Sequence, residues 1–226
     1  MMHTVTSSDG TPIAFWRTGA GPPLLLVHGA TADHTTTWRF VLAELERHFT
    51  VHVMDRRGRG ESRDTPPYDL QREAEDVTAV VDSIAAVLGR PVSVLGHSYG
   101  ALCAIEAALL TPNLSRMALY EGVPLSGSDY YAPGILDRLD ALLDAGKTEE
   151  MLVAILRDVV QMSLTEIEVL RSQKDAWATR LRNAPTVPRE LRAEQRYVFE
   201  PGRFGEVAVP ITLLVGEESP SRELAN

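Results

Sequence analysis

One short stretch limits the folds open to this chain more than any other. Residues 92–105 read VSVLGHSYGALCAI, in which a run of strand formers meets a Gly-His-Ser-Tyr-Gly turn and a small-residue helical run follows at once. Gly96 and Gly100 suit a strained strand-to-helix turn around Ser98, because side chains there would clash with the packed strand and helix. The pattern predicts a serine at the carboxyl edge of a sheet, where open α/β sheets bind ligands.

The first half of the chain alternates between two hydrophobic periods. Strand formers and helically spaced apolar residues take turns, with strands expected at 11–18, 23–27, 51–54 and 116–120 and helices at 37–48 and 69–88. Strands and helices joined by short links require a mostly parallel sheet that helices cover on both faces. The sequence therefore predicts an α/β fold with a mostly parallel, doubly wound sheet.

The pattern changes after residue 121, where amphipathic segments follow one another without a convincing buried strand until a buried strand is expected at 211–215. We expect three parts, namely the first part of the core in 1–121, a helical cap insertion in 122–209, and a return to the core in 210–226. Leucine-rich stripes in the cap, with Tyr130 and Tyr131 near its start, favour a small, mostly apolar substrate.

Charge and composition exclude several classes of partner. The net charge of −9 argues against nucleic acid, whose phosphates select basic surfaces. The one dense basic cluster, within residues 56–63, surrounds a glycine turn and is interpreted as a loop feature. No apolar run is long enough for a membrane span, and residues 1–10 do not resemble a signal peptide. We expect a cytoplasmic protein without a membrane partner, and we leave its oligomeric state open.

No metal or cofactor site is expected from the spacing of the residues. The single cysteine, Cys103, has no internal partner, and no His, Cys or Asp cluster has the spacing of metal ligands. Gly58-Arg59-Gly60 lacks the third glycine that a dinucleotide-binding loop needs. The sequence therefore predicts chemistry carried by side chains alone.

Three motifs together resemble the α/β-hydrolase superfamily. LLLVHGA at 24–30 resembles its strand and oxyanion loop, DRRGRGES at 55–62 its loop after the next strand, and GHSYGA at 96–101 its nucleophile turn. The insertion after residue 121 stands where the family places its cap. The resemblance implies this fold over most of the chain, but it is weak on substrate, because the fold serves many reactions.

The resemblance also implies roles for the residues of these motifs. Ser98 would be the nucleophile, and the Ala30 N–H would be one oxyanion donor, in a loop that His28 and Gly29 support. The helix that follows Ser98 points its positive end at the same place, which makes the Tyr99 N–H the second donor.

A serine in the position of the nucleophile limits the classes of reaction that we expect. A serine fits ester, thioester, lactone or C–C acyl chemistry through an acyl-enzyme, whereas family members that open epoxides or displace halide use aspartate. We expect a hydrolase of a small-molecule substrate, esterase-like. Two alternatives are a non-catalytic small-ligand-binding protein on the same fold, and a cofactor-free lyase or perhydrolase.

The position of the catalytic acid departs from the family pattern. In the family it usually lies three residues after the glycine that follows the last expected strand, and counted from Gly216 that residue is Ser219. Glu218 lies beside it, while Glu121 directly follows an earlier strand, as in other members. We favour Glu121, with Glu218 as the alternative, because a carboxylate there has a short path to a histidine over Ser98.

The base is missing from its usual place. In this fold the triad runs in the order Ser, acid, His, and no histidine follows His97. We therefore expect a hydrolase that lacks the C-terminal strand, histidine loop and helix of the family, with impaired activity in the 226-residue form. His34 is the histidine that we place near the pocket, whereas the His97 side chain is expected to point away from it.

Overall fold

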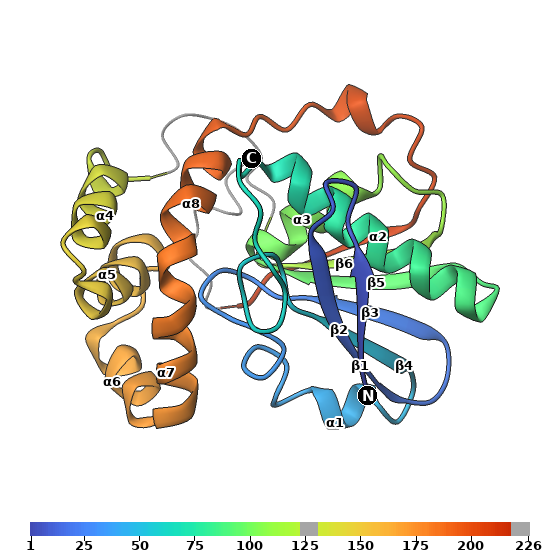
Figure 1. Ribbon diagram of the computed structural model, residues 1–226, viewed down its shortest axis with the longest axis horizontal. Coiled ribbons are helices and arrows are strands. Elements are labelled where there is room, and N and C mark those ends of the chain that lie inside the picture. Colours follow the sequence, from blue (N-terminus) through green and yellow to red (C-terminus); the bar gives the residue numbers. More distant parts are fainter. Residues whose placement is uncertain (123–130, 218–226) are drawn as a thin grey trace.

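The computed structural model describes residues 1–122 and 131–217, so Tyr130 and Glu218 lie outside the described residues. A seven-stranded sheet runs in the order β1-β2-β4-β3-β5-β6-β7 (Figure 1). From β1 to β7 the strands are Met2–Thr6, Pro12–Gly19, Pro23–Val27, Thr50–Met54, Val92–His97, Leu114–Tyr120 and Ile211–Leu214. The pairings from β4 to β7 are parallel, and β1 and β2 pair antiparallel at one side, which confirms the mostly parallel sheet.

Helices cover both faces of this sheet because the buried strand β3 is apolar on both faces. Leu25 and Val27 belong to the core cluster that includes side chains of α2 (Leu70–Leu88) and α3 (Tyr99–Ala107). The alternate residues Leu24 and Leu26 belong to the cluster on the opposite face, against which the short α1 (Leu42–Leu45) packs. The doubly wound arrangement predicted from the sequence is therefore present.

The helix α2 begins and ends where its sequence predicts. The Asp69 carboxylate accepts a hydrogen bond from the Gln71 N–H at 2.8 Å, which satisfies a free donor at the helix start. Gly89 ends the helix in the left-handed conformation, with φ 64°. These caps fix the length of the helix that covers β3 and β5.

Residues 135–196, for which we keep the name cap, form a layer of short helices beside the sheet (Figure 1). Its elements are α4 Ile135–Asp144, α5 Thr148–Ala154, the π-helix Ile155–Val159, α6 Leu164–Ser172, α7 Lys174–Asn183, the 3₁₀ turn Ala184–Thr186 and α8 Val187–Arg196. They enclose a separate cluster of buried apolar side chains that includes Tyr131, Leu139 and Trp177. Ser163 and Glu166 form the capping box that starts α6, as their spacing indicates.

Four features differ from the sequence-based expectations. β1 pairs along β2 although residues 1–10 are polar, because an edge strand needs no buried face. The helix expected over 37–48 contracts to α1, and within the insertion predicted as helical, residues 155–159 form a π-helix directly after α5. β7 is a strand as predicted, but it is not buried: Leu213 is 64% exposed, because β7 pairs only with β6 and is the edge of the described sheet.

The chain returns from the cap along the core. Tyr197, Phe199, Phe204 and Val209 pack against the main core cluster before β7 begins. The boundary drawn at residue 209 stays a prediction. Within the described ranges, no helix has both the length and the apolarity that crossing a membrane demands.

Candidate active site

Ser98 lies at the sharp turn between β5 and α3. Its backbone has φ 53° and ψ −128°, a conformation in which a residue other than glycine is strained. Two hydrogen bonds hold the turn, because the Ser98 N–H donates to the Tyr120 carbonyl at 2.8 Å and the Ser98 carbonyl accepts from the Ala101 N–H at 2.8 Å. The serine is half-buried, at the carboxyl end of the central parallel strands.

The glycines around Ser98 are required by close backbone approach. A Cβ added at Gly100 would lie 2.4 Å from the carbonyl oxygens of Val27 and His28, and one added at Gly96 would lie 2.6 Å from the Ala101 Cα. Backbone atoms cannot yield as a flexible side chain does. The spacing that predicted the turn from the sequence therefore has the expected steric cause.

The loop after β3 packs directly on the turn. A Cβ added at Gly29 would lie 3.0 Å from the Ser98 Cβ, so the loop and the serine are in contact distance. The buried His28 ring fixes this loop, with Nδ1 2.8 Å from the Gly29 carbonyl oxygen and Nε2 accepting the Arg56 N–H at 3.1 Å. Burial, with the Arg56 charge, holds the pKa of His28 well below its usual value, so the ring is neutral.

Two backbone N–H groups flank Ser98 without hydrogen-bond acceptors. Throughout residues 1–122 and 131–217, no hydrogen bond joins the N–H of Ala30 or of Tyr99 to another group. The Tyr99 N–H is the first of α3, at the positive end of the helix. The Tyr99 side chain is buried elsewhere, and its hydroxyl lies 2.8 Å from that of Tyr68.

Glu121 directly follows β6, whose last residue, Tyr120, accepts the Ser98 N–H. The Glu121 backbone has φ 55°, and its Oε1 accepts the Gly216 N–H at 2.6 Å, which ties the ends of β6 and β7 together. The next residue, Gly122, packs on the serine, since a Cβ added there would lie 2.5 Å from the Ser98 carbonyl oxygen. The structure thus brings Glu121 to the turn that carries Ser98.

His34 is held by Asp55 rather than by the serine turn. Its Nδ1 lies 2.9 and 3.0 Å from the two carboxylate oxygens of Asp55, and its ring stacks on Trp16 with centroids 3.5 Å apart. Burial opposes the charged form, but the Asp55 carboxylate outweighs it and raises the pKa of His34. The pairing fixes the ring beside the sheet, in no hydrogen bond to Ser98 among the described residues.

His97 precedes Ser98 in sequence and is half-buried. Its ring stacks on Tyr120 with centroids 5.3 Å apart. Burial lowers the pKa of His97 to about 4, with Glu121 opposing the shift and Arg180 adding to it. Of the histidines in the part of the chain that the structure describes, none hydrogen-bonds the Ser98 hydroxyl.

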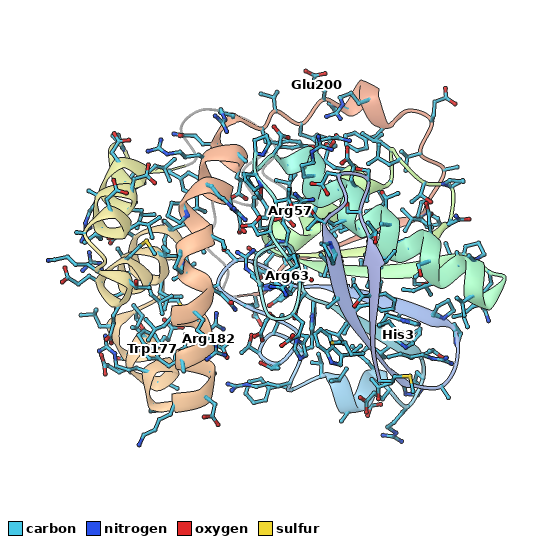
Figure 2. The ribbon with its side chains drawn as sticks, in the orientation of Figure 1. His3, Arg57, Arg63, Trp177, Arg182 and Glu200 are labelled. Carbon is cyan, nitrogen blue, oxygen red and sulfur yellow. The ribbon has the colours of Figure 1, made fainter. Side chains whose placement is uncertain are left out.

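The basic cluster after β4 is buried and paired with carboxylates. Arg56 binds Glu73 through Nε at 3.1 Å and Nη2 at 2.6 Å, and Arg57 binds Asp76 through Nε at 2.7 Å and Nη2 at 2.8 Å. Both carboxylates belong to α2, so the cluster is a structural feature of its loop, as the sequence indicated. Arg63 is exposed; Figure 2 labels Arg57 and Arg63 on this loop, which faces the cap.

Glu190 of α8 connects the same cluster to the cap. Its Oε1 lies 2.5 Å from Arg59 Nη1 and 3.0 Å from Arg56 Nη2, and all three side chains are fully buried. Sequence reasoning missed this carboxylate, because nothing in the pattern of α8 separates it from the surface glutamates of the cap.

A model of the "Alpha/beta hydrolase family" matches residues 24–225, which hold the strand and loop of Ala30, the Ser98 turn and Glu121. The chain belongs to the alpha/beta hydrolase family. A solved alpha/beta hydrolase from Sphaerobacter thermophilus is 34% identical, with a TM-score of 0.82 over 97% of this chain and 84% of that one. The fold predicted from the motifs is therefore confirmed.

Two curated relatives of this family member carry named activities. N-formylmaleamate deformylase from Pseudomonas putida is 40% identical over 111 residues, which cover 48% of this chain and 40% of the relative. Pimeloyl-[acyl-carrier protein] methyl ester esterase from Pseudoalteromonas atlantica is 30% identical over 167 residues, 70% of this chain and 62% of the relative. The chain thus spans less than two thirds of the length of each.

Proposed function

We propose that the protein is an esterase-like serine hydrolase that forms an acyl-enzyme on Ser98 with a small, mostly apolar ester, thioester, lactone or C–C acyl substrate. The observation that carries the proposal is the strained turn that holds Ser98 against Gly29, with two unpaired backbone N–H groups beside it. Similarity to a deformylase and to a methyl ester esterase supports acyl chemistry at this site.

The geometry gives each group a part in the reaction. The Ser98 oxygen attacks the substrate carbonyl, whose oxygen becomes an anion next to the N–H groups of Ala30 and Tyr99. Both donors are fixed before the reaction, one by the His28 brace and one by α3, so they need no reorganisation. Glu121 is our choice for the acid, since it directly follows β6 beside the turn, and we assign no base among the histidines of this sequence.

Replacement of Ser98 tests the nucleophile. The Ser98→Ala protein is expected to lose all labelling by a fluorophosphonate probe and to hydrolyse 4-nitrophenyl butyrate at the background rate, because the hydroxyl is the attacking group. The label is located by mass spectrometry of the digested protein, and unfolding in urea checks that the variant is folded.

Two results would sink this assignment. One is undiminished turnover by Ser98→Ala, and the other is a label on a different residue of the wild-type chain. An unlabelled wild-type protein that still binds small apolar ligands would establish the non-catalytic alternative, and cleavage without transfer to water would favour the lyase or perhydrolase.

Replacement of the two candidate acids tests Glu121. In such sites the carboxylate orients the catalytic base and stabilises its charged form. Glu121→Gln is therefore expected to lower kcat by at least about 10-fold, and Glu218→Gln by less. Initial rates with the same ester measure both variants. The reverse order would move the role to Glu218.

A further inference from the structure

Arg180 reaches from the cap to the loop of the proposed oxyanion donor. It lies on α7, and its Nη1 donates to the Thr31 hydroxyl at 2.7 Å. Thr31 directly follows Ala30 and has a left-handed backbone, with φ 58°. The guanidinium of a cap residue is therefore fixed over the loop that packs on Ser98.

The charge of Arg180 lies close to the turn that carries Ser98. Gly29, two residues before Thr31, is in contact distance of the Ser98 Cβ, and two residues of backbone span at most ~7 Å. The electrostatic effect of Arg180 on the half-buried His97 agrees with this placement, because the Arg180 charge lowers the pKa of that neighbour of Ser98. An acyl substrate on Ser98 would have the guanidinium within reach of its far end.

Arg180 has no carboxylate partner among the residues that the structure describes. No ion pair joins it to an acidic side chain of residues 1–122 or 131–217, and its Nε is buried without a hydrogen-bond acceptor. Burial lowers the pKa of Arg180, the nearby Arg39 acts in the same direction, and Asp33 only partly offsets them. Asp33 is itself engaged, since its Oδ1 accepts the Thr35 N–H at 2.9 Å and the Thr35 hydroxyl at 2.6 Å.

Arg180 is half-buried, and a partly desolvated cation without a counter-ion costs stability, which a bound anion restores. A carboxylate fits a guanidinium best, because its two oxygens accept parallel N–H bonds. Resting on the proposed acyl chemistry of Ser98, we propose that Arg180 binds a carboxylate at the far end of the substrate's acyl chain. The substrate is then a short dicarboxylic acid derivative. One carboxylate is free and binds Arg180, and the acyl group at the other end is the one that Ser98 attacks.

A matched pair of esters tests the proposal. Mono-4-nitrophenyl glutarate carries the carboxylate, and 4-nitrophenyl pentanoate has a chain of the same length without it. We expect wild type to prefer the glutarate, and Arg180→Met to lower the ratio of the two kcat/KM values by about 10²-fold. Arg180→Lys keeps the charge without the planar fork and is expected to recover part of that ratio.

Arg182→Met is the matched control on the same helix. Arg182 is exposed and donates to the Thr179 hydroxyl at 2.7 Å, one turn back along α7, where Figure 2 labels it with Trp177. This variant is expected to keep the wild-type ratio. If Arg180→Met lowered the rates with both esters equally, the contact with Thr31 would be merely structural and the proposal would be wrong.

A binding measurement separates this proposal from the assignment of Ser98. Glutarate is expected to raise the melting temperature of wild type and of Ser98→Ala, but not that of Arg180→Met. If no ester is hydrolysed and no probe labels Ser98 while glutarate still stabilises through Arg180, the serine assignment fails alone. An equal shift in Arg180→Met, or a shift with inorganic phosphate but none with glutarate, overturns the carboxylate site.

Discussion

Two helices of the cap bring ionic groups to the core, and the two contacts differ in charge balance. On α8, the Glu190 carboxylate enters a fully buried cluster and neutralises Arg56 and Arg59. On α7, the hydrogen-bond partner of Arg180 within the described ranges is the neutral Thr31 hydroxyl. The first contact is complete within the protein, whereas the second leaves a positive charge beside the serine turn.

The difference separates a structural role from a binding role. A buried ion pair whose partners are both supplied by the chain holds a loop, because removing one partner leaves an uncompensated charge. A charge that the chain leaves uncompensated at a cleft costs stability unless a ligand supplies the partner. The two contacts are thus distinguished by the partner that each arginine meets.

Glu190→Gln is expected to give the largest change in stability. It leaves Arg59 buried with a neutral partner and weakens the position of Arg56, so the free energy of unfolding should fall by about 3 to 5 kcal/mol. Urea unfolding measures the loss. For Arg180→Met the expected loss is below about 1 kcal/mol, since a hydrogen bond is exchanged for relief of an unpaired charge.

Glu168→Gln is the control for this comparison. Glu168 pairs with Arg171 on the exposed surface of α6, where an ion pair contributes at most about 1 kcal/mol. A Glu190→Gln protein as stable as the Glu168→Gln protein would contradict the structural role of the cluster. An Arg180→Met protein as unstable as Glu190→Gln would remove the distinction between the two contacts.

The serine turn could be predicted from the sequence because its causes are local. The apolar run of β5, the glycines at 96 and 100 and the small residues of α3 are neighbours in the chain, and each agrees with the others. The role of the Ala30 loop was implied by the resemblance of 24–30 to a motif of the family. Glu121 was favoured because other family members place the acid after the same strand, and because parallel strands end at one edge of the sheet.

The charged contacts could not be predicted, because their partners are far apart in the chain. Arg180 and Thr31 are 149 residues apart, and nothing around Arg180 distinguishes it from Arg182. The burial of β7 was predicted wrongly for a related reason. An apolar pattern predicts a strand, but whether both of its faces are covered depends on which other segments lie beside it.

Two histidines differ in the same way, since one is paired and the other is not, but their expected effects on stability are smaller. His34 is paired with Asp55, which raises its pKa, whereas both ring nitrogens of His52 are buried with no acceptor or donor in the described ranges. Burial, with the charges of Arg17 and His3, lowers the pKa of His52 to about 4. The two rings should therefore make the stability depend on pH in opposite directions.

The sign follows from proton binding in the folded and unfolded chains. Between pH about 6.5 and about 4, His52 is protonated in the unfolded chain but not in the folded protein. The free energy of unfolding therefore falls by about 1.4 kcal/mol per pH unit as the pH falls through this window. His34 binds its proton more tightly when folded. Its contribution is complete below pH about 6.5 and is lost as the pH rises through the raised pKa.

Unfolding in urea at pH 5, 7 and 9 separates these two terms. His52→Leu is expected to gain about 1 to 2 kcal/mol relative to wild type between pH 7 and pH 5, because leucine has no proton to take up on unfolding. His34→Gln is expected to lose about 1 kcal/mol at pH 5 and less at pH 9, since the pair with Asp55 is charged only when His34 is protonated. If the stability difference from wild type does not change with pH in either variant, protonation of these two rings is not linked to folding and both predictions are wrong.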